Sequence, residues 1–256
     1  MATNDNSSIR SNQSHAQTGR GGNIVGGNQH NNTTNNLGGM VGHIDLHNRA
    51  PVKSQTDSGG TGKTRILMLA ANPSSTPRLA LDVEAREITD RLQLAQARES
   101  FDLITYWAVR PVDVFQQLNQ HRPHIVHFSG HGNRSGEIVL STSDRDDQFV
   151  SMAAMAEVFR TVKEDTRMVV LNACYSTLQA HAISQHIDYV IGMRAPIDDK
   201  SAAIFAAAFY SALAFQRTVA EAFDQAKVAI ELHRLPGHSI PELIVRPGAR
   251  PYPFSP

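Results

Sequence analysis

Two short motifs contain residue types that together can carry out nucleophilic chemistry. The first, Ser-Gly-His-Gly at 129–132, contains His131, and the second, Asn-Ala-Cys-Tyr-Ser at 172–176, contains Cys174, the only cysteine of the chain. A thiol becomes a strong nucleophile when a nearby imidazole takes its proton or stabilises the thiolate. The backbone N–H groups of Gly132 and Cys174 are candidates for holding the oxyanion of a tetrahedral intermediate. The motifs therefore predict a Cys174–His131 dyad.

Apolar runs alternate with amphipathic stretches after residue 62, and this alternation predicts the elements that position the two motifs. The expected strands cover 65–71, 101–109, 124–130, 167–173 and 189–193, with a side-hairpin strand at 137–142 and an edge strand at 243–245. The expected helices begin at Thr76-Pro77, Pro111, Ser151, about Ser176, about Asp199 and Thr218. The pattern predicts an α/β fold with a mainly parallel sheet of about five or six strands flanked by helices.

The two motifs follow the third and fourth main strands of the expected sheet. Ligands of open parallel sheets bind beyond the carboxyl ends of the strands. Because neighbouring parallel strands end at the same edge, His131 and Cys174 can meet there although they are far apart in the sequence.

The segments HIVHFSGHG (124–132) and VVLNACYS (169–176) surround the two motifs, and a third segment, IGMRAPIDDKSAAIFAAAFYSAL, occupies 191–213. Together, and in this order, they resemble the caspase-like cysteine proteases of clan CD, specifically the bacterial CHAT-type branch. The similarity covers roughly 65–246 and implies the caspase-like fold.

The resemblance implies an endopeptidase that cleaves protein or peptide substrates, with Cys174 as nucleophile and His131 as acid and base. It implies no metal and no organic cofactor in the chemistry. It also implies a regulated effector in a bacterial defence or cell-death pathway. Two other interpretations stay open. One is a non-catalytic signalling or assembly module with the same fold, in which Cys174 is a packed thiol, and the other is a different cysteine hydrolase.

The residues that would select the substrate are less clear from the sequence. In relatives that cleave after Arg or Lys, an Asp two residues before the nucleophile lines the primary pocket. Here Asn172 occupies that position, so the resemblance does not support a preference for Arg or Lys. Asp198 and Asp199 are further pocket candidates, although an Asp at this place more often caps the following helix. The cleavage preference is therefore left open.

Composition argues against several other classes of protein. The 24 Lys and Arg balance the 24 Asp and Glu, so no nucleic-acid partner is indicated. No apolar run approaches the roughly 20 residues of a membrane helix, and the N-terminus has no signal-peptide pattern. We therefore expect a cytoplasmic protein without a membrane partner. A single cysteine excludes an intrachain disulfide and a multi-cysteine zinc site.

Two other patterns are not interpreted as binding sites. The stretch SGGTGKT at 58–64 has Asp57 where a phosphate-binding loop requires its first glycine. His124 and His127 lie three apart on an expected strand and so point to opposite faces. No Cys, Asp or Glu completes a coordination set around them, and we predict no metal site.

The chain before residue 63 differs in composition from the rest. Its first 50 residues hold ten of the fourteen Asn and eight of the seventeen Gly, and the first aromatic residue is Phe101. Such a segment buries too little apolar surface to offset its chain entropy. We therefore expect a disordered arm at 1–62 and a caspase-like domain at 63–256.

Part of this arm, about 21–46, resembles the short amyloid signalling motifs of the RIP-homotypic type. Ile24-Val25 lies between Gly and Asn residues, and such segments can stack into in-register strands with a dry interface. The resemblance implies activation by proximity, through a homo-oligomer or filament or through an upstream activator with a like motif. A flexible polar leader is the alternative.

Overall fold

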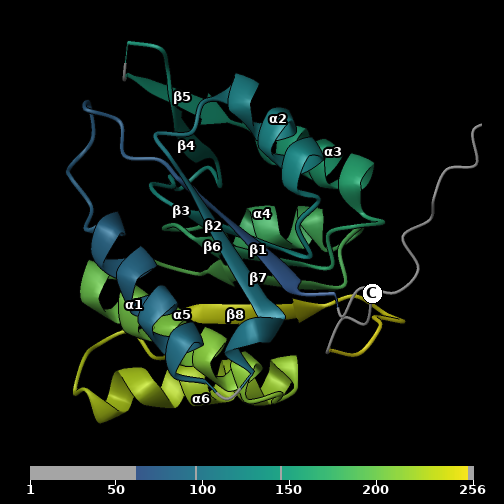
Figure 1. Ribbon diagram of the computed structural model, residues 1–256. Helices are drawn as coiled ribbons and strands as arrows, with labels where there is room; N and C mark the ends of the chain where they lie inside the picture. Colours follow the sequence, from purple (N-terminus) through teal and green to yellow (C-terminus); the bar gives the residue numbers. More distant parts are fainter. Residues whose placement is uncertain (1–61, 96, 145, 253–256) are drawn as a thin grey trace, which may run out of the picture. The chain divides into compact units, whose positions relative to one another are not determined.

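Strands and helices alternate along the chain, as the apolar pattern predicts (Figure 1). The structure is a computed structural model, and it describes residues 62–95, 97–144 and 146–252. The strands are β1 (Thr64–Ala70), β2 (Phe101–Trp107), β3 (Ile125–Ser129), β4 (Ile138–Ser141), β5 (Asp147–Val150), β6 (Met168–Asn172), β7 (Tyr189–Met193) and β8 (Pro241–Val245). The helices are α1 (Leu81–Leu94), α2 (Pro111–His121), α3 (Met152–Val162), α4 (Thr177–Ile183), α5 (Asp199–Ala214) and α6 (Val219–Leu232), with a short 3-10 helix, η1 (Arg98–Ser100).

Six of these strands form one sheet, in the order β2-β1-β3-β6-β7-β8. All neighbours in this sheet pair in parallel except β7 and β8, which are antiparallel. β4 and β5 form a separate antiparallel hairpin. The sheet and the hairpin confirm the predicted fold class, and β8 is the edge strand expected near 243–245.

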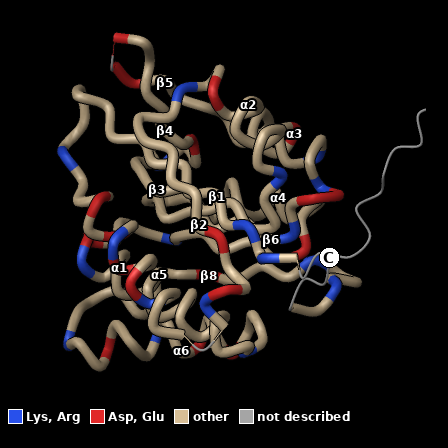
Figure 2. The backbone as a smooth tube through the Cα atoms, viewed as in Figure 1, with Lys and Arg blue, Asp and Glu red and all other residues tan. Residues whose placement is uncertain are grey.

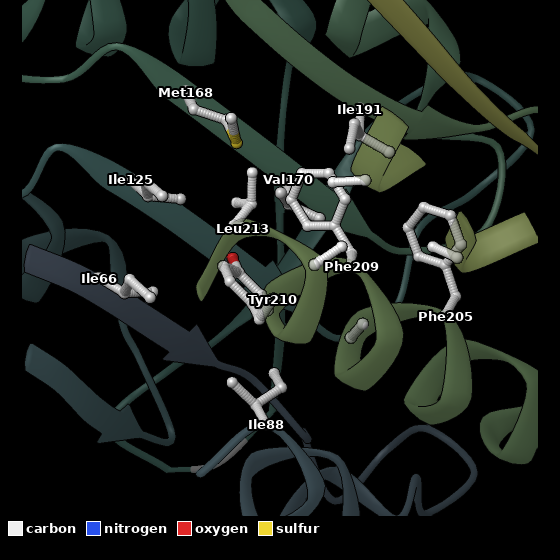
Figure 3. Close-up of a cluster of buried hydrophobic side chains, with 14 of the residues drawn as sticks. Ile66, Ile88, Ile125, Met168, Val170, Ile191, Phe205, Phe209, Tyr210 and Leu213 are labelled. Atoms are coloured by element: carbon white, nitrogen blue, oxygen red, sulfur yellow. The ribbon is translucent and has the colours of Figure 1, made fainter. Parts of the chain in front are cut away.

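The central strands β1, β3, β6 and β7 are buried on both faces of the sheet, which explains why they are mainly apolar. Alternate residues of β1 pack to opposite sides, with Ile66 and Met68 in one core cluster and Leu67 and Leu69 in the other. The first cluster includes side chains of α1, α5 and α6, and the second those of α2, α3 and α4. Figure 3 shows strand side chains of the first cluster meeting those of α1 and α5, including Tyr210.

Local capping confirms several expected helix starts. The Ser151 hydroxyl accepts a hydrogen bond from the Ala154 N–H at the start of α3. At the start of α6, Thr218 and Glu221 form the expected capping box, in which each side chain accepts from the other residue's N–H.

One helix start was predicted wrongly. The sequence places the beginning of α1 at Thr76-Pro77, whereas the helix begins at Leu81. The Asn72 side chain explains the difference, because its amide donates to the Leu79 carbonyl (3.0 Å) and accepts from the Leu79 N–H (3.2 Å). These bonds hold 72–79 as a loop outside the helix.

Charged residues of both signs are spread along the described chain, as Figure 2 shows. No helix among the described residues is long and apolar enough to cross a membrane. The segment 21–46 lies outside the described residues, and the division of the chain near residue 62 stays a prediction.

Candidate active site

Pairing of β3 with β6 brings the two predicted motifs together. Ser129 and Asn172, the last residues of these strands, are partners in the parallel register, and the Gly130 N–H donates to the Asn172 carbonyl at 3.3 Å. His131 and Cys174 each lie two residues beyond this paired position. Both line one small cavity of about 40 Å³ at this edge of the sheet, and both are partly exposed.

Gly132 allows the loop after β3 to pass directly over the nucleophile loop. A Cβ at this position would lie 2.2 Å from the Cys174 carbonyl oxygen, so no side chain fits. Two backbone bonds to the β4 segment hold the loop: Val139 N–H to His131 (3.0 Å) and Asn133 N–H to Glu137 (3.1 Å). Neither bond uses the Gly132 N–H. The oxyanion role of Gly132 and Cys174 N–H groups stays a prediction.

The turn that carries Cys174 is anchored by Ser176. Its hydroxyl donates to the Leu171 carbonyl and accepts from the Met193 N–H, both at 2.9 Å, and so ties the turn to β6 and β7. Tyr175 adopts a left-handed conformation with φ 57°, an uncommon state for a residue with a side chain. This tight turn allows Cys174 to protrude between β6 and α4.

The loop before α1 orients His131. Nε2 of His131 lies 2.8 Å from the Pro77 carbonyl oxygen. A carbonyl only accepts, so Nε2 carries the hydrogen, and the lone pair of the neutral ring is at Nδ1. The Asn72–Leu79 hydrogen bonds fix the loop that presents this carbonyl. The ring therefore has one nitrogen held by the protein and one available as a base.

A buried carboxylate that the sequence analysis did not identify lies in the same cavity. Glu84 of α1 is almost fully buried and accepts hydrogen bonds from His127 (2.9 Å), Asn172 (2.5 Å) and Ser129. His127 continues the network to the Tyr210 hydroxyl at 3.1 Å. The signal was present in the sequence, because Glu84 falls on the apolar face of α1, three residues after Leu81 and four before Ile88.

The network keeps Glu84 ionised. Burial raises the pKa of its carboxyl, but the charge interaction with His127 and the hydrogen bonds from His127, Ser129 and Asn172 outweigh burial and hold the pKa below its ordinary value. Burial and the Glu84 charge raise the pKa of Tyr210 well above its ordinary value, so its phenol stays protonated.

Asn172, a predicted pocket residue, lines the cavity. Its amide nitrogen also lies 3.3 Å from the Ala202 carbonyl. Its Oδ1 is buried and has no hydrogen-bond partner within the described chain. This oxygen is thus a buried acceptor without a partner among the described residues, and solvent does not reach it.

The other two pocket candidates differ in position. The Asp198 carboxylate caps α5 by accepting from the Ser201 N–H at 3.0 Å, which is the helix-cap alternative raised by the sequence, and Asp198 is not among the cavity lining. Asp199 lines the cavity, and its carboxylate accepts from the Ala80 N–H at 2.9 Å.

The histidines near the site have separate surroundings. His127 is fully buried beside Glu84 and Tyr210, whereas Nδ1 of His124 accepts from the Arg65 N–H at 3.0 Å. Over the ranges that the structure describes, no three His, Cys, Asp or Glu side chains converge as metal ligands.

Comparison with known proteins identifies the family. The model of the CHAT domain matches residues 5–239, which is most of the chain. The chain belongs to the CHAT domain family, a caspase-like protease family.

Two curated relatives carry protease names. The chain is 24% identical over 217 residues to a "Roc-COR-CHAT protease" from an unknown prokaryotic organism; the match covers 79% of this chain and 20% of that protein. It is 23% identical over 150 residues to a "Probable protease" of Gillisia limnaea, with 58% of this chain and 26% of that protein covered. The chain therefore spans about a fifth to a quarter of the length of these relatives.

Replacing Glu84 by Gln should reduce stability in a pH-dependent way. The folded-state pKa lies below the ordinary 4.5, so the stabilisation by the charged form is complete above that value and is lost as the pH falls through the folded-state pKa. We expect E84Q to unfold about 1–3 kcal/mol more easily at pH 7, with the difference shrinking below pH 4.5. Thermal unfolding midpoints from pH 7 to pH 3 measure this.

The matched control is E157Q, because Glu157 forms an exposed ion pair with Arg160. Such pairs contribute about 0–1 kcal/mol, so this variant should remain close to the parent at every pH. If the unfolding midpoints of E84Q and the parent differed by the same amount at every pH, the stabilising role of the ionised Glu84 would be contradicted.

Proposed function

We propose that the chain is a cysteine endopeptidase in which Cys174 is the nucleophile and His131 the acid and base. The observation that carries the proposal is the placement of His131 and Cys174 in one cavity, with Nε2 of His131 bonded to the Pro77 carbonyl. That bond leaves Nδ1 as the nitrogen that can accept a proton. The protease names of the relatives support the same class of reaction.

In the first half of the reaction, His131 Nδ1 takes the thiol proton and the thiolate attacks the carbonyl carbon of the scissile peptide bond. The N–H groups of Gly132 and Cys174 stabilise the oxyanion. The Pro77 carbonyl stabilises the imidazolium through Nε2. His131 then donates its proton to the leaving amine, the C–N bond breaks, and a thioester remains on Cys174.

In the second half, His131 takes a proton from water and the hydroxide adds to the thioester carbonyl. The C–S bond breaks, the acid is released, and the proton returns to the thiolate. All atoms come from the peptide, one water and the dyad, so the cycle needs no further reactant.

Alanine at either dyad position should abolish cleavage while leaving the fold intact, because both side chains are partly exposed. We expect C174A to lower kcat by about 10³-fold or more, and H131A by about 10²- to 10⁴-fold. The measurement is cleavage of a synthetic peptide library by each purified variant, with H181A on the exposed face of α4 as control. Undiminished cleavage by C174A would reject the dyad, and absence of cleavage by the parent would favour the non-catalytic module.

We further propose that the cavity selects a basic side chain. Of the described residues that line it, Glu84 and Asp199 carry carboxylates and none is Lys or Arg. Glu84 and Asn172 are almost fully buried, which makes them the closed side of the cavity. A donor-bearing cation in the cavity would be attracted by the carboxylates of Glu84 and Asp199. The carboxylate that would select Lys or Arg thus comes from Glu84 of α1. Position 172, where the sequence has Asn, does not supply it.

Neutralising the cavity carboxylates should change the cleavage preference. We expect E84Q and D199N each to lower the ratio of cleavage after Lys or Arg to cleavage after Gln by about tenfold, since hydrogen bonds to charged groups contribute about 1.5–3 kcal/mol. D198A is the control: it should cost about 1 kcal/mol of stability through the lost cap and leave the ratio unchanged. The same cleavage ratio in the parent, E84Q, D199N and D198A would reject the proposal that this cavity selects a basic side chain.

The segment 21–46 lies outside the described residues, and its role is a proposal that rests on its resemblance to amyloid signalling motifs. We propose that it assembles the chain into a homo-oligomer or filament, or joins it to an activator with a like motif, so that protease domains become concentrated. The protein would then act as an effector in bacterial defence or cell death.

Deleting residues 1–50 should separate assembly from catalysis. We expect the truncated protein to form no filaments by electron microscopy and to cleave peptides more slowly at low protein concentration, because proximity is lost. A variant with a Gly-Ser linker of equal length in place of 1–50 should behave like the deletion. Filaments that persist in both variants would rule out this role for the segment.

A further inference from the structure

A second, much larger hollow is lined by residues of α1, α5 and α6. These helices cover one side of the sheet (Figure 1). Its volume is about 1240 Å³, above the 300–1,000 Å³ usual for small-molecule sites. All three helices line it, and we call it the three-helix groove.

The shape of the three-helix groove follows the helices. Each helix contributes residues along most of its length, from Val83 to Arg91 on α1, from Asp199 to Ala212 on α5 and from Asp224 to Leu232 on α6. α5 has 16 residues and is therefore about 24 Å long at 1.5 Å per residue. The volume spread over that length gives a cross-section of about 50 Å², roughly half that of an α-helix with its side chains.

The surface of the groove suits a helix. α5 contributes four alanines, Ala203, Ala207, Ala208 and Ala212, and small residues allow another backbone to approach to the 8–10 Å of packed helices. Large apolar side chains on the other helices remain exposed: Val83 and Val228 by about half, and Leu232 by 77%. An exposed apolar patch of this kind usually marks an interaction site.

The three-helix groove adjoins the catalytic cavity. Ala80 and Asp199 line both hollows, and the Ala80 N–H donates to the Asp199 carboxylate at 2.9 Å between them. α1 and α5 both begin at this junction and run away from it. A substrate segment bound beside Cys174 would therefore lie next to this end of the groove, with the Ala80–Asp199 hydrogen bond between the two hollows.

We propose that the three-helix groove docks an amphipathic α-helix of the protein substrate, next to the segment that is cleaved. The inference rests on the proposed peptidase function and adds a substrate class: proteins whose cleavage site adjoins a helix of about four turns. That helix carries a stripe of aliphatic side chains at i, i+3, i+4 and i+7, the spacing of helix-in-groove recognition.

Charges at the groove add a constraint on the docked helix. Glu87 and Arg91 of α1 and Asp224 of α6 are among the lining residues, and Arg217 lies at the end away from the cavity. Both signs flank the apolar surface, so the matching helix carries both signs beside its stripe. Arg91, in the last turn of α1, and Arg217 lie toward the end of the groove away from the cavity. They favour an acidic residue at the corresponding end of the docked helix.

Two pairs of variants test the proposal. V228E with L232E places two carboxylates in the groove, and L94E with V112E is the matched control. Leu94 is 75% exposed in the last turn of α1, as Leu232 is in that of α6, and Val112 is 73% exposed on α2. Neither control residue lines the groove. All four side chains are at least half exposed, so the variants should fold.

Cleavage is measured on two substrates that share one cut site: a protein identified by its Cys174-dependent cleavage, and a ten-residue peptide spanning that cut. We expect V228E/L232E to lower kcat/KM for the protein by tenfold or more and to leave the peptide unchanged. The control pair should alter neither. Equal rates on the protein for both pairs, or equal losses on protein and peptide, would overturn the docking role.

A separate binding measurement distinguishes this failure from failure of the peptidase proposal. A displayed library of 16-residue helical peptides is selected on the C174A protein and then tested on C174A carrying either pair. If no protein or peptide shows Cys174-dependent cleavage by the parent, the proposed function fails. Peptides that bind the control pair but not V228E/L232E would then still support helix docking. If no such peptides emerge, helix docking is overturned too.

A second copy of this chain is the rival occupant. Sedimentation of the parent and of V228E/L232E decides this case. A parent oligomer that becomes monomeric in V228E/L232E, but not in L94E/V112E, would overturn the substrate as occupant.

Discussion

The buried carboxylate of Glu84 is the interaction on which the arrangement of the site depends. It joins α1 to the ends of β3 and β6 through Ser129 and Asn172, and to α5 through His127 and Tyr210. A buried charge is tolerated only when its hydrogen-bonding capacity is satisfied, so these elements hold one another in register. The same bonds set the edge of the sheet from which the loops that carry His131 and Cys174 emerge.

Two features of the backbone bring His131 and Cys174 together at that edge. Parallel pairing of β3 with β6 starts both loops from the same level, and Gly132 allows one loop to lie against the other at the Cys174 carbonyl. The Pro77 carbonyl then leaves Nδ1 as the free nitrogen of the neutral His131 ring. The position of both side chains results from loops that are anchored by backbone hydrogen bonds at the strand ends, where ligands of α/β folds usually bind.

Membership of the CHAT family defines the class of protein, and the chain's own surface defines what it can recognise. The catalytic cavity is narrow and acidic, whereas the three-helix groove is long and mainly apolar, and Ala80 and Asp199 belong to both. In the proposed function, the cavity would bind a short segment through its charge and the groove a longer one through its shape. The small cavity alone offers limited discrimination between proteins, so the adjacent groove would supply much of the selectivity.

The sequence by itself determined the α/β class, nearly every strand and helix, and the two motifs that carry His131 and Cys174, because these depend on local periodicity and on residue chemistry. The sequence also offered two roles for Asp198, a pocket residue or a helix cap, and the structure shows the cap. Tertiary structure alone decided that α1 begins at Leu81, that Pro77 orients His131 and that Glu84 joins Asn172 in the cavity. These outcomes depend on contacts between residues far apart in the chain, for which local pattern carries no information: Glu84 reads as one polar position on an apolar helix face until β3 and β6 supply its partners.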